Sequence, residues 1–254
     1  MDTSPLIAEG HYARKQIGCR SRIISFSHGS RFRMACRLVE PFVGTSVLDY
    51  GCGDGSFLAM VADKFPVAVG ADVDAKQNAD CAARFASLKH VSFVHTSALN
   101  DPANEARYRV VACMETLEHV TEEIMPIVLS DLRRCLAADG TLIISVPIEI
   151  GPTLPLKQMM RRIAGWRKLG DYAGSERYTV AEITKMTFAG SHTQIVRPAY
   201  SSPDGAFHAH KGFNWRRLRE RLRESFTIRQ TRFTPFAWSG GLISSQAWFI
   251  CGHR

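Results

Sequence analysis

A glycine-rich turn early in the chain has the residue types and spacing of a ligand-binding loop. The run VLDYGCGDGSFL, residues 47–58, joins an apolar, β-rich segment to a segment with helical character. Glycines let backbone amides approach a ligand without interference from a Cβ atom. The N-terminus of the helix that follows favours a negative group such as a carboxylate or phosphate. Asp49, two residues before the first glycine, could bind an ammonium group directly or through water.

The spacing around this turn distinguishes two kinds of nucleotide site. The dinucleotide fingerprint GxGxxG needs Gly or Ala at position 56, where this chain has Ser56. Asp72 ends the next β-rich segment, nineteen residues after Gly53. An acidic group there is placed to accept hydrogen bonds from ribose hydroxyls, although a helix N-cap is the alternative role. The pattern argues against an NAD-linked oxidoreductase, which is kept as an alternative.

Three histidines could remove a proton from an oxygen acceptor, because the pKa of imidazole lies near neutrality. His119 follows the fourth predicted strand, at the edge where ligands bind in open α/β sheets. His208 and His210 lie in the run GAFHAHKGFNW, before the last predicted helix. Structural hydrogen bonds or an ordinary polar loop would explain the same residues.

An ExxEH run, formed by Glu115, Glu118 and His119, could instead hold a metal. Two carboxylates and an imidazole, joined by a later histidine, suit a hard divalent ion that polarises vicinal hydroxyls. We favour a site without a metal and keep this set as the alternative.

Alternating elements must position these residues. Short apolar runs predict strands at 46–50, 67–72, 90–95, 108–114 and 141–146. The intervening segments predict helices at 29–41, 55–65 and 74–87. A further helix is expected to begin at about Thr121, its expected N-cap. This alternation predicts a parallel sheet covered on both faces. A helix at 213–226, with Trp215, Leu218 and Leu222 on one face, precedes strands at 226–233 and 244–252 that should pair as a hairpin.

The expected fold class is therefore α/β, a Rossmann-like doubly wound sheet of about seven strands, mostly parallel, with a C-terminal antiparallel hairpin. Residues 1–45 are expected to form a helical extension, and 46–254 a single domain with a cap inserted at about 147–212. In the cap, Met159, Met160, Ile163 and Trp166 are expected to pack on the core. The alternatives are a wall of an apolar acceptor pocket or an interfacial helix with a basic polar face.

Four motifs in order carry a family resemblance. VLDYGCGDGSFL, VGADVD, CMETLEHV and LAADGTLIISVP resemble the motif set of class I S-adenosylmethionine-dependent methyltransferases, over roughly residues 29–146 and more loosely the final strand pair. The antiparallel hairpin is characteristic of that family and separates it from dehydrogenases. The resemblance implies S-adenosyl-L-methionine as the cofactor.

The resemblance also implies roles for the matched positions. Asp49, Gly51, Cys52, Gly53 and Gly55 would line the methionine part of the cofactor, Asp72 would hold the ribose, and Val73 would pack on the adenine. Ser97 and Ala98 would flank the adenine edge, although many relatives have Asp where Ser97 stands, and Met114 and Glu115 would lie near the sulfonium. Tyr12 and Lys15, in an N-terminal segment, are candidates to close over the cofactor.

The acceptor is less defined. The ExxEH run is similar both to the metal-binding run of small-RNA terminal 2′-O-methyltransferases and to the MExLEHV run of ubiquinone-biosynthesis O-methyltransferases. We expect O-methylation of a small molecule: a sugar, a glycolipid precursor or another secondary metabolite. A metal-assisted RNA 2′-O-methyltransferase is the main alternative, and a fold that binds the cofactor without turnover is another. The sequence does not define the oligomeric state.

Charge and composition narrow the partners. Residues 1–45 carry a net charge of +4, residues 46–156 of −7 and residues 157–254 of +11. The basic ends fit an anionic or lipid-linked acceptor, whereas no nucleic-acid-binding motif supports RNA. An odd number of cysteines, seven, and the absence of a signal-like start or a long apolar run lead us to expect a cytoplasmic protein.

Overall fold

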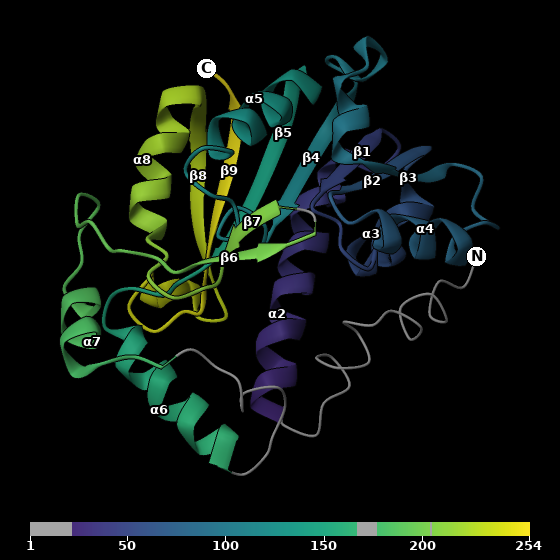
Figure 1. Ribbon diagram of the computed structural model, residues 1–254. Helices are drawn as coiled ribbons and strands as arrows, with labels where there is room; N and C mark the ends of the chain where they lie inside the picture. The colour runs from purple at the N-terminus through teal and green to yellow at the C-terminus, as the bar shows by residue number, and fades with distance from the viewer. Residues whose placement is uncertain (1–21, 167–176, 204) are drawn as a thin grey trace.

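The computed structural model describes residues 22–166, 177–203 and 205–254 (Figure 1). Tyr12 and Lys15 lie outside the described residues, as does the whole segment before α2 (Arg22–Val39). Within the described part, no helix combines the length and apolar character needed to cross a bilayer.

A seven-stranded sheet forms the centre of the molecule, in the order β3-β2-β1-β4-β5-β9-β8. Its strands are β1 (Ser46–Tyr50), β2 (Val67–Asp72), β3 (Val91–His95), β4 (Tyr108–Met114), β5 (Leu136–Pro147), β8 (Phe226–Thr234) and β9 (Gln246–His253). The first five are parallel, whereas β9 pairs antiparallel with both β5 and β8. The predicted Rossmann-like sheet and its C-terminal antiparallel pair are therefore confirmed.

The helices follow the predicted alternation. They are α3 (Ser56–Val61), α4 (Ala75–Arg84), α5 (Met125–Cys135), α6 (Thr153–Trp166), α7 (Val180–Thr187) and α8 (Trp215–Ser225), with short 3-10 turns at 40–42, 62–64, 96–100, 102–104 and 237–239. The three residues expected on the buried face of α8, Trp215, Leu218 and Leu222, are all buried.

The start of α5 corrects one prediction. Thr121 is not the N-cap, because the helix begins at Met125 after Ile124. The carbonyl of Thr121 instead accepts hydrogen bonds from the amides of Ile124 and Met125, at 3.2 and 3.0 Å, in a preceding turn. Pro126 is tolerated in the first turn of a helix, where its missing N–H would have no partner, and this favours the later start.

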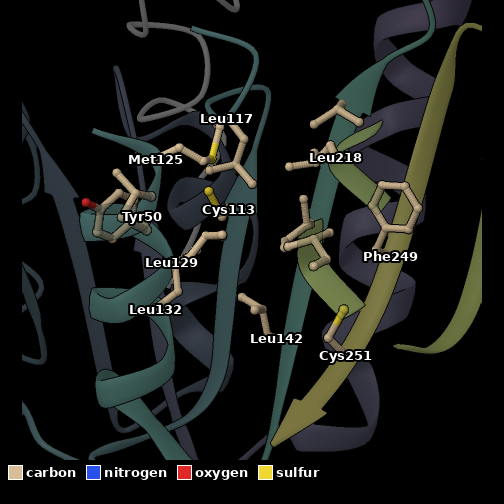
Figure 2. Close-up of a cluster of buried hydrophobic side chains, with 14 of the residues drawn as sticks. Tyr50, Cys113, Leu117, Met125, Leu129, Leu132, Leu142, Leu218, Phe249 and Cys251 are labelled. Atoms are coloured by element: carbon tan, nitrogen blue, oxygen red, sulfur yellow. The ribbon is translucent and has the colours of Figure 1, made fainter. Parts of the chain in front are cut away.

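Alternation along the strands explains why both faces of the sheet are covered. In β1, Val47 packs into one apolar cluster and Leu48 into the other, and Val110 and Val111 of β4 divide in the same way. Figure 2 shows part of one cluster, in which side chains from α5 and α8 meet those of the central strands. The continuous apolar runs of the sequence follow from this burial on two sides.

The inserted segment after β5 contributes α6, α7 and a separate two-stranded hairpin, β6 (Ala199–Ser202) with β7 (Gly205–His208). Figure 1 shows these elements beyond the carboxyl ends of the parallel strands. The expectation that Met159, Met160 and Trp166 pack on the core is wrong, since 52%, 38% and 82% of these residues is exposed. The side chain of Ile163 lies outside the described part.

Candidate functional site

The glycine turn after β1 requires glycine for a steric reason. Gly51 has φ +76°, and its amide donates to the carbonyl of Ala71 at 2.7 Å. A Cβ atom on Gly51 would overlap the side chain of Thr116, which follows β4. Gly53 and Gly55 also have positive φ, +51° and +70°. The turn is thus pressed against the neighbouring loop, with its backbone at the carboxyl edge of the sheet.

Asp72 joins this turn to the end of β2. Its carboxylate accepts hydrogen bonds from the amide of Gly53 at 2.8 Å and from the amide of Asp74 at 3.0 Å. Asp74 in turn caps α4, accepting from the amides of Lys76 and Gln77. The helix N-cap role considered for Asp72 therefore belongs to Asp74. The carboxylate of Asp72 stands beside the loop, at the sheet edge.

Asp49 is a buried carboxylate under the same turn. Burial, followed by the charges of Asp72 and Asp54, raises its pKa to about 8. All three causes of this shift, burial and the two like charges, disfavour the ionised carboxylate. A buried carboxylate among like charges is stabilised by a positive group, which fits a cofactor that carries an ammonium and a sulfonium.

The adjoining surface is open. Val73 is 50% exposed, and both Ser97 and Ala98 are exposed at the end of β3. The amide and hydroxyl of Ser97 contact Nδ1 of His95, at 3.2 and 2.8 Å, so this serine is held in place by its own turn. Cys52 differs from its neighbours, because its side chain is buried and only its backbone can face a ligand.

Glu115 occupies a constrained position after β4, with Met114 half-buried beside it. Glu115 has φ +53°, unusual for a residue other than glycine, and its amide donates to the carbonyl of Ser145 at 2.9 Å. Its carboxylate lies 3.4 Å from the guanidinium of Arg31 in α2. Sequence reasoning missed Arg31, because no local pattern links α2 to a loop more than eighty residues later.

His119 is held in one orientation by the hairpin that crosses the site. Its Nδ1 lies 2.7 Å from the carbonyl oxygen of His208, whose amide donates to the carbonyl of His119 at 2.9 Å. A carbonyl oxygen only accepts, so Nδ1 carries a proton, and in the neutral ring Nε2 is then the nitrogen with the lone pair. The side chain of His119 is 39% exposed. The ring of His208 points elsewhere, with Nδ1 2.8 Å from the carbonyl of Pro198.

His210 and Glu118 lie against His119. The two imidazoles meet edge-to-face, with centroids 4.9 Å apart. Burial lowers the pKa of His210 to about 4. Burial, reinforced by Glu115, raises the pKa of Glu118 well above its ordinary value, and neither of its carboxyl oxygens has a hydrogen-bond partner in the described part of the chain.

These three residues form a potential metal-binding group. One ligand atom from each of Glu118, His119 and His210 lies within 4.8 Å of the others. The later histidine foreseen for such a set is His210, whereas the carboxylate of Glu115 is engaged by Arg31. The Nε2 atom of His119 lies 3.9 Å from Glu118.

A second ionic group, unforeseen in the sequence, supports this side of the site. Glu149, fully buried after β5, lies 2.8 Å from Arg161 and 3.2 Å from Lys157 of α6. Burial disfavours its charge, but Lys157 and Arg161 outweigh that effect and lower the pKa of Glu149 to about 2. The only sequence signal was the basic character of α6, which gave no indication of a buried partner.

Comparison with known families agrees with the geometry of the site. The profile of a family described as a methyltransferase domain matches residues 28–185, more than half of the chain. The chain belongs to this methyltransferase family. Membership excludes the oxidoreductase alternative, and the class I fold with its glycine turn identifies S-adenosyl-L-methionine as the methyl donor.

Solved structures share the fold over nearly the whole methyltransferase chain. Magnesium protoporphyrin IX methyltransferase from Synechocystis, crystallised with S-adenosylhomocysteine, is 16% identical with a TM-score of 0.53, covering 100% of this chain and 94% of that one. The N-methyltransferase NodS from Bradyrhizobium japonicum is 14% identical with a TM-score of 0.52, covering 89% and 96%. A search of curated proteins finds no match. At these identities the structures show the fold alone.

A third similar structure holds both a cofactor product and an acceptor. The 1,6-didemethyltoxoflavin-N1-methyltransferase from Burkholderia thailandensis, with bound 1,6-didemethyltoxoflavin and S-adenosylhomocysteine, is 18% identical with a TM-score of 0.51. The match covers 92% of this chain and 87% of that one. Its acceptor is a small molecule, whereas its methylated atom is nitrogen.

Proposed function

We propose that this methyltransferase transfers the methyl group to an oxygen of a small molecule, with Nε2 of His119 as the general base. The observation that carries the proposal is the hydrogen bond between Nδ1 of His119 and the carbonyl of His208, 2.7 Å long. It fixes the tautomer in which Nε2 accepts a proton, at the carboxyl edge of the sheet where acceptors bind.

His210 and His208 have supporting roles in this proposal. Burial holds His210 neutral, so it places no second positive charge beside His119 when that imidazole takes up a proton. His208 acts through its backbone carbonyl, which accepts the Nδ1 proton and would stabilise the imidazolium. In this proposal the three histidines therefore have different roles, and only His119 acts as a base.

The cofactor would lie along the glycine turn. Its sulfonium supplies an electrophilic methyl group with a neutral leaving group, so the protein's main contribution is to position the reactants. We propose that the residues inferred from the motifs surround it: Asp49, Gly51, Cys52, Gly53 and Gly55 at the methionine part, Asp72 at the ribose, Val73, Ser97 and Ala98 at the adenine, and Met114 and Glu115 near the sulfonium. The buried Asp49, whose ionised form is disfavoured by the nearby Asp72 and Asp54, supports this placement.

The test is a screen of hydroxylated acceptors with labelled S-adenosylmethionine, followed by His119→Asn on the best acceptor. We expect kcat to fall about 10²- to 10⁴-fold, with little change in the Kd for S-adenosylhomocysteine. His253→Asn is the matched control, because His253 also contacts a backbone carbonyl, that of Leu136 at 2.9 Å, near the end of β9. An unchanged kcat in His119→Asn would exclude the general-base role.

Metal-assisted 2′-O-methylation of RNA is the second candidate. It is favoured by the grouping of Glu118, His119 and His210 and by the unpartnered oxygens of Glu118, which suit a hard divalent ion. Chelation followed by Mg²⁺ addition would then abolish and restore activity, and binding to RNA would weaken with salt. Full activity in chelator would exclude this candidate.

The acceptor class is proposed on charge and surface. The +11 charge of residues 157–254 favours an anionic or lipid-linked acceptor. A cytoplasmic location stays a prediction. Including such acceptors in the first screen, with uncharged analogues beside them, tests the preference, and equal kcat/KM for both would contradict it.

A further inference from the structure

The amphipathic helix α6 has its polar side turned inward. Lys157 and Arg161, one turn apart, both reach the buried carboxylate of Glu149, and the ammonium of Lys157 also donates to the carbonyl of Ile148 at 2.8 Å. Leu154, on the same helix, is fully buried. The charged residues that would normally face water therefore attach this helix to the rest of the protein.

The outer side of α6 is correspondingly apolar. Leu156, Met159, Met160 and Trp166 are exposed by 47%, 52%, 38% and 82%. Met159, Met160 and Trp166 follow Leu156 by three, four and ten residues, which places all four along one side of the helix. A surface helix of a globular protein has the opposite arrangement, so this stripe indicates a surface that is covered in use.

A loop tied to the start of α6 also exposes large apolar side chains. The hydroxyl of Thr153, at the start of α6, contacts the carbonyls of Gly241 and Leu242, both at 3.1 Å, and so ties the loop after β8 to the helix. In that loop Trp238 is 82% exposed and Leu242 59%. Exposed tryptophans beside leucine and methionine are typical of protein segments that enter the interface of a bilayer.

Charge identifies the partner. Of the three basic residues of α6, Lys157 and Arg161 are paired with the buried Glu149, whereas Arg162 is exposed beside the apolar stripe, and the helix contains no acidic residue. It lies in the part of the chain with a net charge of +11. An anionic lipid surface complements an apolar stripe flanked by an exposed arginine in a basic part of the chain.

We propose that the outer face of α6, together with the Trp238 loop, is a docking surface for an anionic lipid bilayer. The helix would lie in the plane of the interface, with its apolar stripe among the acyl chains and Arg162 at the headgroups. Because α6 lies beyond the carboxyl ends of the parallel strands (Figure 1), docking would bring the methyl-transfer site close to the membrane surface.

The test is flotation of the full chain with vesicles of phosphatidylcholine, with and without phosphatidylglycerol. We expect binding to the anionic vesicles, reduced about tenfold or more in Met159→Gln/Trp166→Gln and clearly weakened in Arg162→Glu. Matched controls are Ile127→Gln and Arg133→Glu, since both residues are exposed on α5. The controls should bind like the wild type, and circular dichroism should show an unchanged fold in every variant.

Three results would overturn the proposal. The first is failure of the wild type to bind anionic vesicles. The second is binding that the α6 variants leave unchanged, which would place the contact elsewhere. The third is a concentration-dependent dimer, seen by sedimentation velocity and lost in Met159→Gln/Trp166→Gln, which would show that a second copy covers the stripe. None of these depends on which acceptor is methylated.

Discussion

The proposed cofactor side and the proposed acceptor side of this site are built in different ways. The cofactor side uses backbone groups and short turns after β1, β2 and β4, and its main hydrogen bond joins Gly53 to Asp72. The acceptor side uses charged and imidazole side chains from segments far apart in the sequence, such as His119 with His210 and Glu149 with Arg161. The first is therefore sensitive to backbone shape, and the second to charge.

The sharpest contrast should come from Gly51→Ala. Positive φ and overlap with Thr116 together should cost about 3 kcal/mol and abolish binding of S-adenosylhomocysteine. Gly44→Ala is the control, because Gly44 has φ +84° but nothing within 4 Å of a Cβ. Thermal unfolding and calorimetric titration measure both effects. If the two variants lose stability and binding to the same extent, the effect comes from backbone strain and not from the contact with Thr116.

Asp72→Ala should weaken binding of S-adenosylhomocysteine about tenfold to hundredfold, because the amides of Gly53 and Asp74 lose their acceptor together with the proposed ribose contact. Asp101→Ala is matched to it, since Asp101 also accepts from a backbone amide, that of Ala103 at 2.8 Å, in an exposed turn. Calorimetric titration measures the affinity of both variants for S-adenosylhomocysteine. If Asp72→Ala binds as tightly as Asp101→Ala, Asp72 does not contribute to cofactor binding.

On the acceptor side, Glu149→Gln should lower stability by about 2 kcal/mol, since it leaves Lys157 and Arg161 without their buried counter-charge. For a chain of this size Tm should fall by about 4–8 °C. Glu220→Gln, in an exposed group with Arg219 and Arg223, should not change Tm detectably. An unchanged Tm in Glu149→Gln would mean that the buried ionic group does not hold α6.

The smallest expected effect is a pH dependence from Asp49. Its pKa is raised by burial to about 8, so the folded state holds a proton that the unfolded state has released. The contribution to stability is therefore complete below the ordinary pKa and is lost as pH rises toward about 8. Binding of S-adenosylmethionine should release this proton and so strengthen from pH 6.5 to pH 8.5. The same titration of Asp49→Asn serves as the control, because the ligand's own ionisation affects both proteins equally. If the affinity of both proteins depends on pH in the same way, Asp49 does not release a proton on binding.

The order of elements was predictable because each strand and helix is specified by residues close together in sequence. All five parallel strands, the C-terminal pair and the buried face of α8 agree with the predictions from apolar periodicity. The start of α5 did not agree with its prediction. Thr121 is a good N-cap residue, but Pro126 favours a later start of the helix. Prediction and structure agreed least in the cap, because the hydrophobicity of a segment does not show which face of α6 is buried.

The sequence by itself determined the sheet and the glycine turn, because these depend on local spacing and on backbone conformation, and the resemblance of its motifs indicated the methyltransferase class. The tertiary structure decided which side chains meet across long separations: Arg31 with Glu115, Glu118 with His119 and His210, and Glu149 with two basic residues of α6. It also decided that α6 turns two of its three basic residues inward. Such pairings depend on how distant segments pack, and one chain read alone contains no local pattern that encodes them.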